Sequence, residues 1–475
     1  MAAPALPIFP HRPARRAAWL IAAVVVAGGA VSGVHRGMEG RPNWGSIQRE
    51  TQYVWQHLQS APATALFGYL PTAIFALWPF TTWTPQPAGL ALFVLTNVVA
   101  AGGAAWLLAR WWLPGGGPAA SIVWPLLLVA ANIAHVLSAN QLTLWTLFLC
   151  VAGFTLLERS RPGIGGGLLG LAALVKTIPL LLVGYLVLRR KWRGLAGFAA
   201  AIVIADLVPC LLFFGWRGTI AEHRAWLRRA EWHSNRRLID DPLLRVHRHG
   251  SNASLSVVLA RWLRKPPGAA RQVILEGEPP PEVVAARRAT LGPDERLTVD
   301  PMNSSDQIWT ERIVELAPLR IPRMHVADLS ADVVWWIWAA IIASMLISLG
   351  VITFRAPDRA WPSLAALWML AMLAPSPMLR HYYLALALPA LVVIWRMMTR
   401  ARARSNGWTV GGRLAAVACA GWLVGIACLG WGVPRWYGIH LGVLVLVAAA
   451  TVWSIRAAAR SEPEPARLAS ADQLC

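Results

Sequence analysis

The sequence predicts an all-α polytopic membrane protein. Of its 475 residues, 56% are hydrophobic and only 14% are charged. The apolar residues form long blocks, as in chains that cross a bilayer. A helix of ~20 apolar residues spans the hydrocarbon core, where every backbone polar group must be bonded within the protein. The blocks lack the period of two that a membrane β-barrel requires, so helices are predicted.

The apolar blocks lie between charged or Pro/Gly-rich breaks and predict about 11 to 13 transmembrane helices. The chain after the first block is still membrane, so that block is expected to remain as an uncleaved anchor. The candidate spans are residues 17–34, 65–80, 88–109, 121–137, 140–157, 163–188, 194–214, 334–354, 361–375, 381–398, 413–431 and 438–455.

The formal net charge of +21 comes from basic clusters at the ends of spans. No basic face with interleaved aromatic residues is visible, so nucleic-acid binding is not predicted. If each block crosses once, all clusters fall on one side, and the positive-inside rule assigns that side and both termini to the cytoplasm. We therefore expect a multi-pass protein of the cell (plasma or inner) membrane. The clusters are Arg12, Arg15 and Arg16; Arg189, Arg190, Lys191 and Arg193; Arg396, Arg400, Arg402 and Arg404; and Arg456 and Arg460.

This topology divides the chain into five parts. The polar segments at 35–64 and 215–332 both follow an odd number of crossings, so both are expected to be extracytoplasmic. The parts are a cytoplasmic N-terminus (1–16), an N-terminal transmembrane bundle (17–214) that contains the loop 35–64, an extracytoplasmic loop (215–332), C-terminal transmembrane helices (333–457) and a disordered cytoplasmic tail (458–475).

No metal site or cofactor is predicted. The five cysteines are scattered without a CxxC pair. Asp240, Asp241, His247 and His249 could ligate a metal, but Pro242 interrupts the segment, and a solvated loop is the favoured interpretation.

Three glycines, Gly165, Gly167 and Gly170, fit the pattern GxGxxG. A dinucleotide-binding fingerprint needs a preceding strand, and none is predicted. We interpret these glycines as small residues that let helices approach closely.

A carboxylate, Glu50, follows the first span with Tyr53 behind it. Near the bilayer surface it could accept the proton of an acceptor hydroxyl while a lipid-linked group departs, which makes it a candidate general base. Glu39 on the same loop is the alternative base. A solvated loop residue is the simpler interpretation of either carboxylate.

Two cations lie at informative positions. Lys176 is embedded in Leu, Ala and Val, where a cation costs about 2.5 to 3.5 kcal/mol and usually lines a cavity or meets an anion. Arg380 precedes His381 and Tyr382 at the outer end of the tenth span. An arginine there suits a phosphate through bidentate hydrogen bonds, although anchoring to headgroups is an equal alternative.

The order of these short motifs resembles glycosyltransferase family 87. The resemblance covers residues 17–400 and rests on Glu-x-x-Tyr, Tyr-x-Pro, Asn-Gln, "GLLGLAALVKTIP", "SNASL" and "SPMLRHYY" in that order. It implies a GT-C-like bundle similar to the polyprenol-phosphate-mannose-dependent mannosyltransferases. By position it implies a base at Glu50 and substrate binding by Tyr53, Tyr69, Asn140, Gln141, Lys176, Asn252, Ser254, His381 and Tyr382. Arg380, next to His381, is the substrate-binding candidate that its own chemistry suggests.

Strict alternation of crossings places Asn140 and Gln141 inside, whereas the resemblance requires them at the outer cavity. The conflict disappears if a block at 65–80, 88–109 or 121–137 is re-entrant and the block 163–188 is two short helices hinged near Lys176 and Pro179. We favour this arrangement, because one straight helix of that length would be long for the bilayer.

The predicted activity is transfer of a hexose, mannose by resemblance, from a polyprenyl phosphate sugar to an extracytoplasmic hydroxyl of a lipid or glycan, with inversion. Lys176, Arg380 and His381 would stabilise the departing phosphate. Membrane lipids are the other expected partners, and no oligomeric state is predicted. A transporter or flippase for a lipid-linked or amphiphilic substrate is the alternative, and an inactive scaffold the third, since Glu50 stands where the family usually has aspartate.

Overall fold

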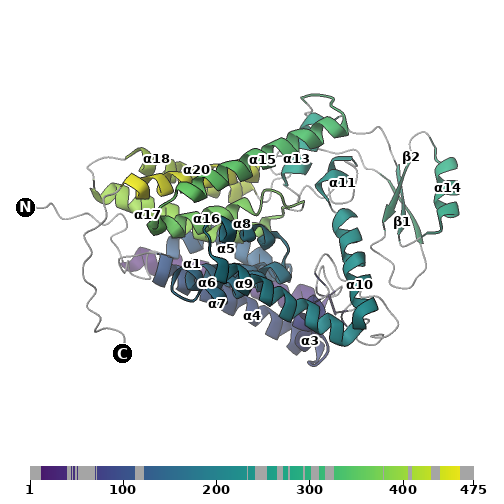
Figure 1. Ribbon diagram of the computed structural model, residues 1–475, viewed down its shortest axis with the longest axis horizontal. Coiled ribbons are helices and arrows are strands. Elements are labelled where there is room, and N and C mark those ends of the chain that lie inside the picture. Colours follow the sequence, from purple (N-terminus) through teal and green to yellow (C-terminus); the bar gives the residue numbers. More distant parts are fainter. Residues whose placement is uncertain are drawn as a thin grey trace, which may run out of the picture.

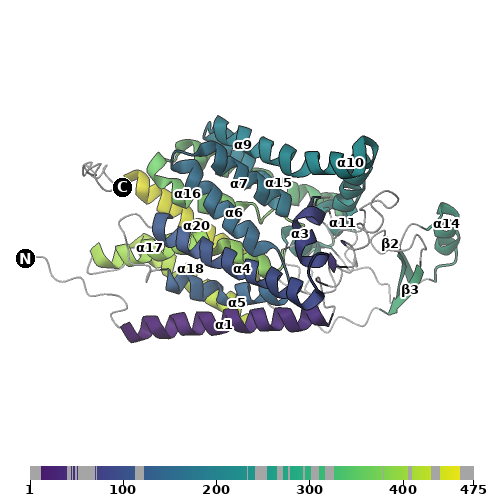
Figure 2. The same cartoon turned by 90° about the horizontal axis from the view of Figure 1, so that it is seen from below.

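The computed structural model is an elongated helical bundle with a small sheet beyond one end (Figures 1 and 2). Seven helices in the described part of the chain are long and apolar enough to cross a membrane. The predicted class, an all-α polytopic membrane protein, is confirmed. The structure describes residues 12–39, 44, 47–48, 51, 70, 72–112, 122–232, 234–240, 254–264, 271–276, 279–292, 295–300, 310–315, 326–377, 379–404, 409–428 and 439–460.

The N-terminal half contributes short and long apolar helices in close contact. Its elements are α1 (Arg12–Met38), α3 (Ala73–Thr81), α4 (Gln86–Leu107), η1 (Leu108–Trp112), α5 (Val123–Ser138), α6 (Thr143–Glu158), α7 (Pro162–Val175), η3 (Ile178–Leu181), α8 (Leu182–Leu188), α9 (Trp192–Ile202), η4 (Val203–Leu207) and α10 (Val208–Trp232).

The C-terminal half holds the small sheet and the remaining helices. Its elements are α11 (Asn235–Asp240), α13 (Leu255–Leu263), β1 (Arg271–Glu276), α14 (Pro281–Ala289), β2 (Glu295–Asp300), β3 (Thr310–Glu315), α15 (Ala331–Arg355), η6 (Asp358–Ala360), α16 (Trp361–Ala371), η7 (His381–Ala387), α17 (Leu388–Arg404), α18 (Val410–Ala427) and α20 (Ile439–Arg460).

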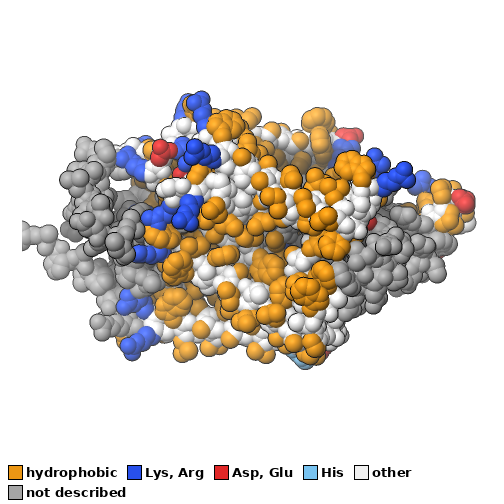
Figure 3. Space-filling view, turned by 60° about the horizontal axis from the view of Figure 1, so that its bottom comes forward, with side chains coloured by type: hydrophobic (Ala, Val, Ile, Leu, Met, Phe, Trp, Pro, Cys, Tyr) orange, Lys and Arg blue, Asp and Glu red, His pale blue; other side chains and the backbone are white. Residues whose placement is uncertain are grey.

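One end of the bundle is basic. The start of α1 and the end of α20 lie there (Figure 2), and Figure 3 shows Lys and Arg clustered at this end beside a broad hydrophobic surface. Arg189 donates to the carbonyls of Thr353 and Ala356, at 3.3 and 2.8 Å, and Arg359 donates to the carbonyl of Ala458 at 2.9 Å. These bonds tie the ends of α8, α15 and α20 together, and we call this the basic end.

The opposite end, called the site end below, is where α1 finishes and α4 begins. A Cβ on Gly37 of α1 would lie 2.5 Å from Leu90 of α4. The intervening helix α3 has only nine residues, about 14 Å at 1.5 Å per residue, which is too short to cross. The expectation of a full span at 65–80 is therefore wrong, and the re-entrant alternative fits.

The block predicted at 163–188 is a hairpin rather than one crossing. Its two arms, α7 and α8, are separated by extended backbone at Lys176 and the 3-10 turn η3. Lys191, just after α8, forms an ion pair with Glu158, just before α7, at 2.9 Å. Both ends of the hairpin thus lie at the basic end, and the predicted hinge near Lys176 and Pro179 is confirmed.

A second hairpin is formed by α16 and by η7 with α17. Trp361 at the start of α16 contacts Trp112 at 5.2 Å between ring centroids, and Trp395 on α17 stacks on Trp124, the second residue of α5, at 6.0 Å. The hairpin therefore begins and ends toward the basic end, and its tip lies at the site end. The two hairpins pack together, since a Cβ on Gly184 would lie 2.6 Å from the ring of Trp368.

Helix α10 bends at Gly215, whose φ of 65° and ψ of 178° are not helical. The second arm of α10 leads to α11, α13 and the sheet, which stand beyond the site end (Figure 1). In the sheet, β1 is central, parallel to β2 and antiparallel to β3. The segment 215–332, predicted as a polar loop, thus carries secondary structure of its own.

Glycines bring α7 and α9 into backbone contact. A Cβ on Gly166 would lie 1.8 Å from the carbonyl oxygen of Gly194, and one on Gly170 would lie 2.6 Å from that of Phe198. Gly165 meets α6 in the same way, whereas Gly167 has room for a side chain. Because α7 is not preceded by a strand, the interpretation of this pattern as helix packing is confirmed.

Candidate functional site

The site is built at the tip of the α7–α8 hairpin. Helix α7 ends at Val175, and Lys176 adopts extended backbone with φ −147° and ψ 134°. Its side chain is only 7% exposed, and its Nζ donates to Oγ1 of Thr143 at 2.9 Å. Thr143 is the first residue of α6, so the lysine bridges the tip to the site end of a neighbouring helix.

Two tyrosines from the second hairpin cover the lysine. The Nζ atom of Lys176 lies 4.0 Å from the ring centroid of Tyr383 and 5.1 Å from that of Tyr382. Both distances are within the range of cation–π attraction, which strengthens when the cation is desolvated. The tips of the two hairpins therefore meet at Lys176.

Arg380 brings a second positive charge to the same place. It immediately precedes η7, hydrogen-bonds to Tyr382, and repels Lys176 electrostatically. Its Nε atom is buried and makes no hydrogen bond. Among the described residues, no carboxylate forms an ion pair with Lys176 or Arg380.

A buried lysine and a half-buried arginine, neither paired with a described carboxylate, are suited to an anionic ligand. Burial of a charge is costly unless the charge is paired. A phosphate would neutralise both groups, and arginine can bind it through two parallel N–H bonds. The arrangement can therefore hold a phosphate and stabilise negative charge as it develops.

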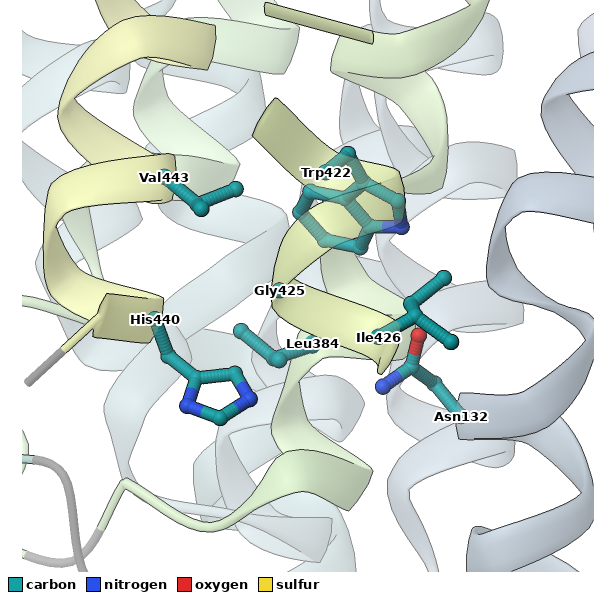
Figure 4. Close-up of a pocket in the computed structure, with 7 residues that line it drawn as sticks. All are labelled: Asn132, Leu384, Trp422, Gly425, Ile426, His440 and Val443. Atoms are coloured by element: carbon teal, nitrogen blue, oxygen red, sulfur yellow. The ribbon is translucent and has the colours of Figure 1, made fainter. Parts of the chain in front are cut away.

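His381 extends the site toward α5. Its ring contacts that of His135 at 4.5 Å, and its backbone carbonyl accepts a hydrogen bond from Nδ2 of Asn132 at 3.1 Å. Residues of α5, η7, α18 and α20 line a small pocket nearby, among them Asn132, Leu384, Trp422 and His440 (Figure 4). The ring centroids of His381 and His440 are 6.4 Å apart, so His381, next to Arg380 in sequence, also lies near a residue that lines this pocket.

Asn140 and Gln141 lie at the site end, as the resemblance requires. Asn140 has a φ of 51°, a left-handed conformation that asparagine tolerates better than most residues. Its Nδ2 donates to the carbonyl of Gly33 at 3.2 Å, and Gln141 is 7% exposed. The side-chain amide of Asn140 thus bonds the turn between α5 and α6 to α1. Asn140 is three residues before Thr143.

The predicted base region is described in part. Glu39 is exposed at the end of α1, and one of its carboxylate oxygens lies 3.6 Å from Nε2 of His35. Glu50, Tyr53, Tyr69 and Asn252 lie outside the described residues, as do Asp241, His247 and His249. Ile47 and Thr51, on either side of Glu50, are both buried.

Aromatic residues connect this region with α6. Trp44 is fully buried and contacts Phe93 at 5.2 Å, and Phe93 in turn contacts Trp145 at 5.9 Å. Trp145 is two residues beyond Thr143 on α6. The segment that carries the candidate base therefore packs against the helix that bonds Lys176.

Ser254 lies at the start of α13. It is the fully buried N-cap of α13, and its Oγ lies 3.3 Å from Oγ of Ser256. A nearer approach to the site comes from α11, where Nδ2 of Asn235 donates to the carbonyl of Pro375 at 2.8 Å. Pro375 belongs to the turn that leads to Arg380.

No functional role is predicted from the sequence for Thr143, His135, Asn132 or Tyr383. Each is a polar or hydroxyl-bearing side chain in an apolar segment, which was the available signal. Among the described residues, a different group has the composition of a metal site, namely Asp206, Cys210 and His223 near the bend of α10.

Comparison with known protein families gives a match to part of the chain. The model of glycosyltransferase family 87 matches residues 67–286, a segment that contains Asn140, Gln141 and Lys176 but not Glu50 or Arg380. No curated protein and no solved structure matches the chain. Over residues 67–286 the chain is similar to glycosyltransferase family 87, and this similarity indicates a membrane glycosyltransferase.

Proposed function

We propose that the protein transfers a hexose, mannose by family resemblance, from a polyprenyl phosphate sugar to an acceptor hydroxyl on a lipid or glycan. The observation that carries this proposal is the meeting of Lys176 and Arg380 at the tips of two hairpins, without a carboxylate partner among the described residues. By the positive-inside rule, the basic end and both termini face the cytoplasm and the site faces outward.

The two cations would hold the donor phosphate. In the reaction, the bond between the anomeric carbon and the phosphate oxygen breaks, and the acceptor oxygen bonds to that carbon from the opposite face, with inversion. Lys176 and Arg380 would stabilise the charge on the departing polyprenyl phosphate, and His381 lies directly beside Arg380. A lipid-borne donor can enter between helices, so the proposal needs no nucleotide-binding domain.

The acceptor proton would go to a carboxylate base. Glu50 is the preferred candidate, because its neighbours Ile47 and Thr51 are buried in the core that leads to Thr143. Glu39 is the alternative, although it is exposed and has His35 as its neighbour. No cofactor enters this scheme.

Reconstitution into vesicles with polyprenyl phosphate mannose and a candidate acceptor tests the proposal. Wild type is expected to transfer sugar. Glu50→Gln is expected to lower the rate about 10²- to 10⁴-fold, the usual contribution of a general base. Lys176→Gln is expected to lower it about 10²- to 10³-fold, as for removal of an electrostatic stabiliser. Arg193→Gln, which removes an exposed cation at the basic end, is the matched control and should retain activity.

Two results would overturn these assignments. If neither Glu50→Gln nor Glu39→Gln affects transfer, the base assignment is wrong. If wild type moves the lipid between leaflets and transfers no sugar to any acceptor, the protein is the transporter or flippase of the alternative hypothesis.

A further inference from the structure

The bend between α9 and the second arm of α10 contains two irregularities. The π-helical turn η4 precedes α10, and Gly215 breaks α10 itself. Oγ1 of Thr219, in the first turn of the second arm, donates back to the carbonyl of Gly215 at 2.8 Å. Figure 1 shows the second arm running steeply away from the direction of α9. We call residues 203–223 the elbow. A π-helical turn inside a helix is frequent at functional sites.

Three potential metal ligands converge inside the elbow. Asp206 is 6% exposed and Cys210 is fully buried, while His223 comes from the second arm of α10. Their ligand atoms all lie within 4.8 Å of one another. His223 Nε2 is 3.0 Å from Oδ2 of Asp206, and Cys210 Sγ is 3.8 Å from Oδ1. The thiol and the imidazole thus face different oxygens of one carboxylate.

The imidazole is oriented as in many metal sites. Nδ1 of His223 lies 2.8 Å from the carbonyl oxygen of Thr219. A carbonyl can only accept a hydrogen bond, so Nδ1 carries the hydrogen, and in the neutral ring Nε2 presents its lone pair toward Asp206. Metal-bound histidines are typically fixed in this way, with the distal ring nitrogen bonded to a carbonyl or carboxylate.

We propose that Asp206, Cys210 and His223 bind a zinc ion that fastens the elbow. Carboxylate, thiolate and imidazole are all zinc ligands, and tetrahedral zinc places an S···O pair about 3.5 Å apart and an N···O pair about 3.3 Å apart. In the protein, Sγ lies 3.8 Å from Oδ1 and Nε2 lies 3.0 Å from Oδ2, and one ligand atom from each of the three residues lies within 4.8 Å of the others. Small movements of the side chains would admit the ion.

The charges in the elbow favour a divalent cation. Glu222, adjacent to His223 in sequence, is 4% exposed and acts electrostatically on both Cys210 and His223. Two carboxylates therefore lie buried beside a thiol that zinc binds as a thiolate. The competing interpretation is an ion pair between Asp206 and a doubly protonated His223, which needs no thiol.

Metal analysis of the whole protein separates these interpretations without reference to sugar transfer. The protein is purified in detergent through a tag that contains no histidine, loaded with zinc and dialysed. Wild type is expected to retain one equivalent of zinc. Cys210→Ser and His223→Gln should each weaken zinc binding more than about 100-fold, beyond the 10- to 100-fold effect of outer-sphere changes. Cys428→Ser, which alters another buried cysteine, should bind like wild type.

Substitution with Co²⁺ gives a second, spectroscopic readout. Thiolate-bound Co²⁺ absorbs in the near ultraviolet, so the loaded wild type should show this band, Cys428→Ser should keep it and Cys210→Ser should lose it. A wild type that retains no zinc and shows no such band overturns the proposal in favour of the ion pair. Equal zinc retention by wild type and Cys210→Ser also overturns it.

Discussion

Glu158 and Lys191 form an ion pair of 2.9 Å across the open ends of the α7–α8 hairpin. Tyr185 on α8 strengthens the same junction, since its hydroxyl donates to Glu158 at 2.8 Å. An ion pair between residues on either side of an apolar block shows that the block enters the bundle and returns. The ion pair places the open ends of the hairpin at the basic end. Lys176, at the tip of the hairpin, therefore lies at the site end.

Surface labelling can check this path. With Cys475 replaced by serine, single cysteines are introduced as Arg161→Cys, Arg193→Cys and Glu39→Cys, all at exposed positions. A membrane-impermeant maleimide is expected to label residues 161 and 193 from the same side and residue 39 from the other. Labelling of 161 and 193 from opposite sides would mean that the block crosses once, against the hairpin.

The hydrogen bond from Lys176 to Thr143 is expected to position the lysine for catalysis. Thr143→Val preserves shape but leaves the buried Nζ without this acceptor. Hydrogen bonds to charged groups contribute about 1.5 to 3 kcal/mol, so kcat/KM for the lipid-linked donor should fall about tenfold or more. Thr146→Val is the matched control, because Thr146 bonds only to Leu142 of its own helix. Equal effects of the two variants would contradict a special role for Thr143.

The ring of Tyr383 is expected to matter more than its hydroxyl. Tyr383→Phe keeps an aromatic face over Lys176, whereas Tyr383→Leu removes it. Cation–π attraction amounts to about 0.5 to 2 kcal/mol, which corresponds to about a 2- to 30-fold loss of kcat/KM for the leucine variant. Steady-state kinetics in proteoliposomes measure both variants. If phenylalanine and leucine are equally impaired, the contact is not the reason for the tyrosine.

Close packing of α7 on α9 predicts a large difference between adjacent glycines. Gly166→Ala would place a methyl group against the backbone of Gly194, whereas the nearest atom to a Cβ on Gly167 is 3.7 Å away. Overpacking typically costs 1 to 3 kcal/mol, so Gly166→Ala should lower the Tm in detergent. Gly167→Ala should leave it unchanged or raise it slightly, because alanine favours helix. Similar melting of both variants would contradict the contact.

Much of the fold was predictable because membrane helices obey strong local rules. Apolar blocks of sufficient length predicted the helices, and the basic clusters predicted that one end would collect positive charge. The length of the block at 163–188, with Lys176 and Pro179 inside it, also predicted the hinge. These features depend only on composition within a short window of sequence.

The arrangement of the site depended on contacts between distant residues. Lys176 and Tyr383 are far apart in sequence, and nothing local indicates that a second hairpin would place its tyrosines over the lysine. Likewise, the ion pair between Glu158 and Lys191 marks the open ends of the first hairpin. In the sequence, however, each is only a charged residue near the end of an apolar block, and nothing indicates that the two pair. Asp206 and His223 belong to helical segments that only the bend at Gly215 brings together.

The hydrogen bond from Asn235 to Pro375 has a mechanical consequence. Pro375 is five residues before Arg380, and Asn235 is the first residue of α11. If α11 is displaced, this bond must break or the loop must follow, and the guanidinium is attached to that loop. This hydrogen bond therefore couples α11, outside the bundle, to Arg380 at the tip of the second hairpin. Binding of a ligand at either place can then shift the position of the other.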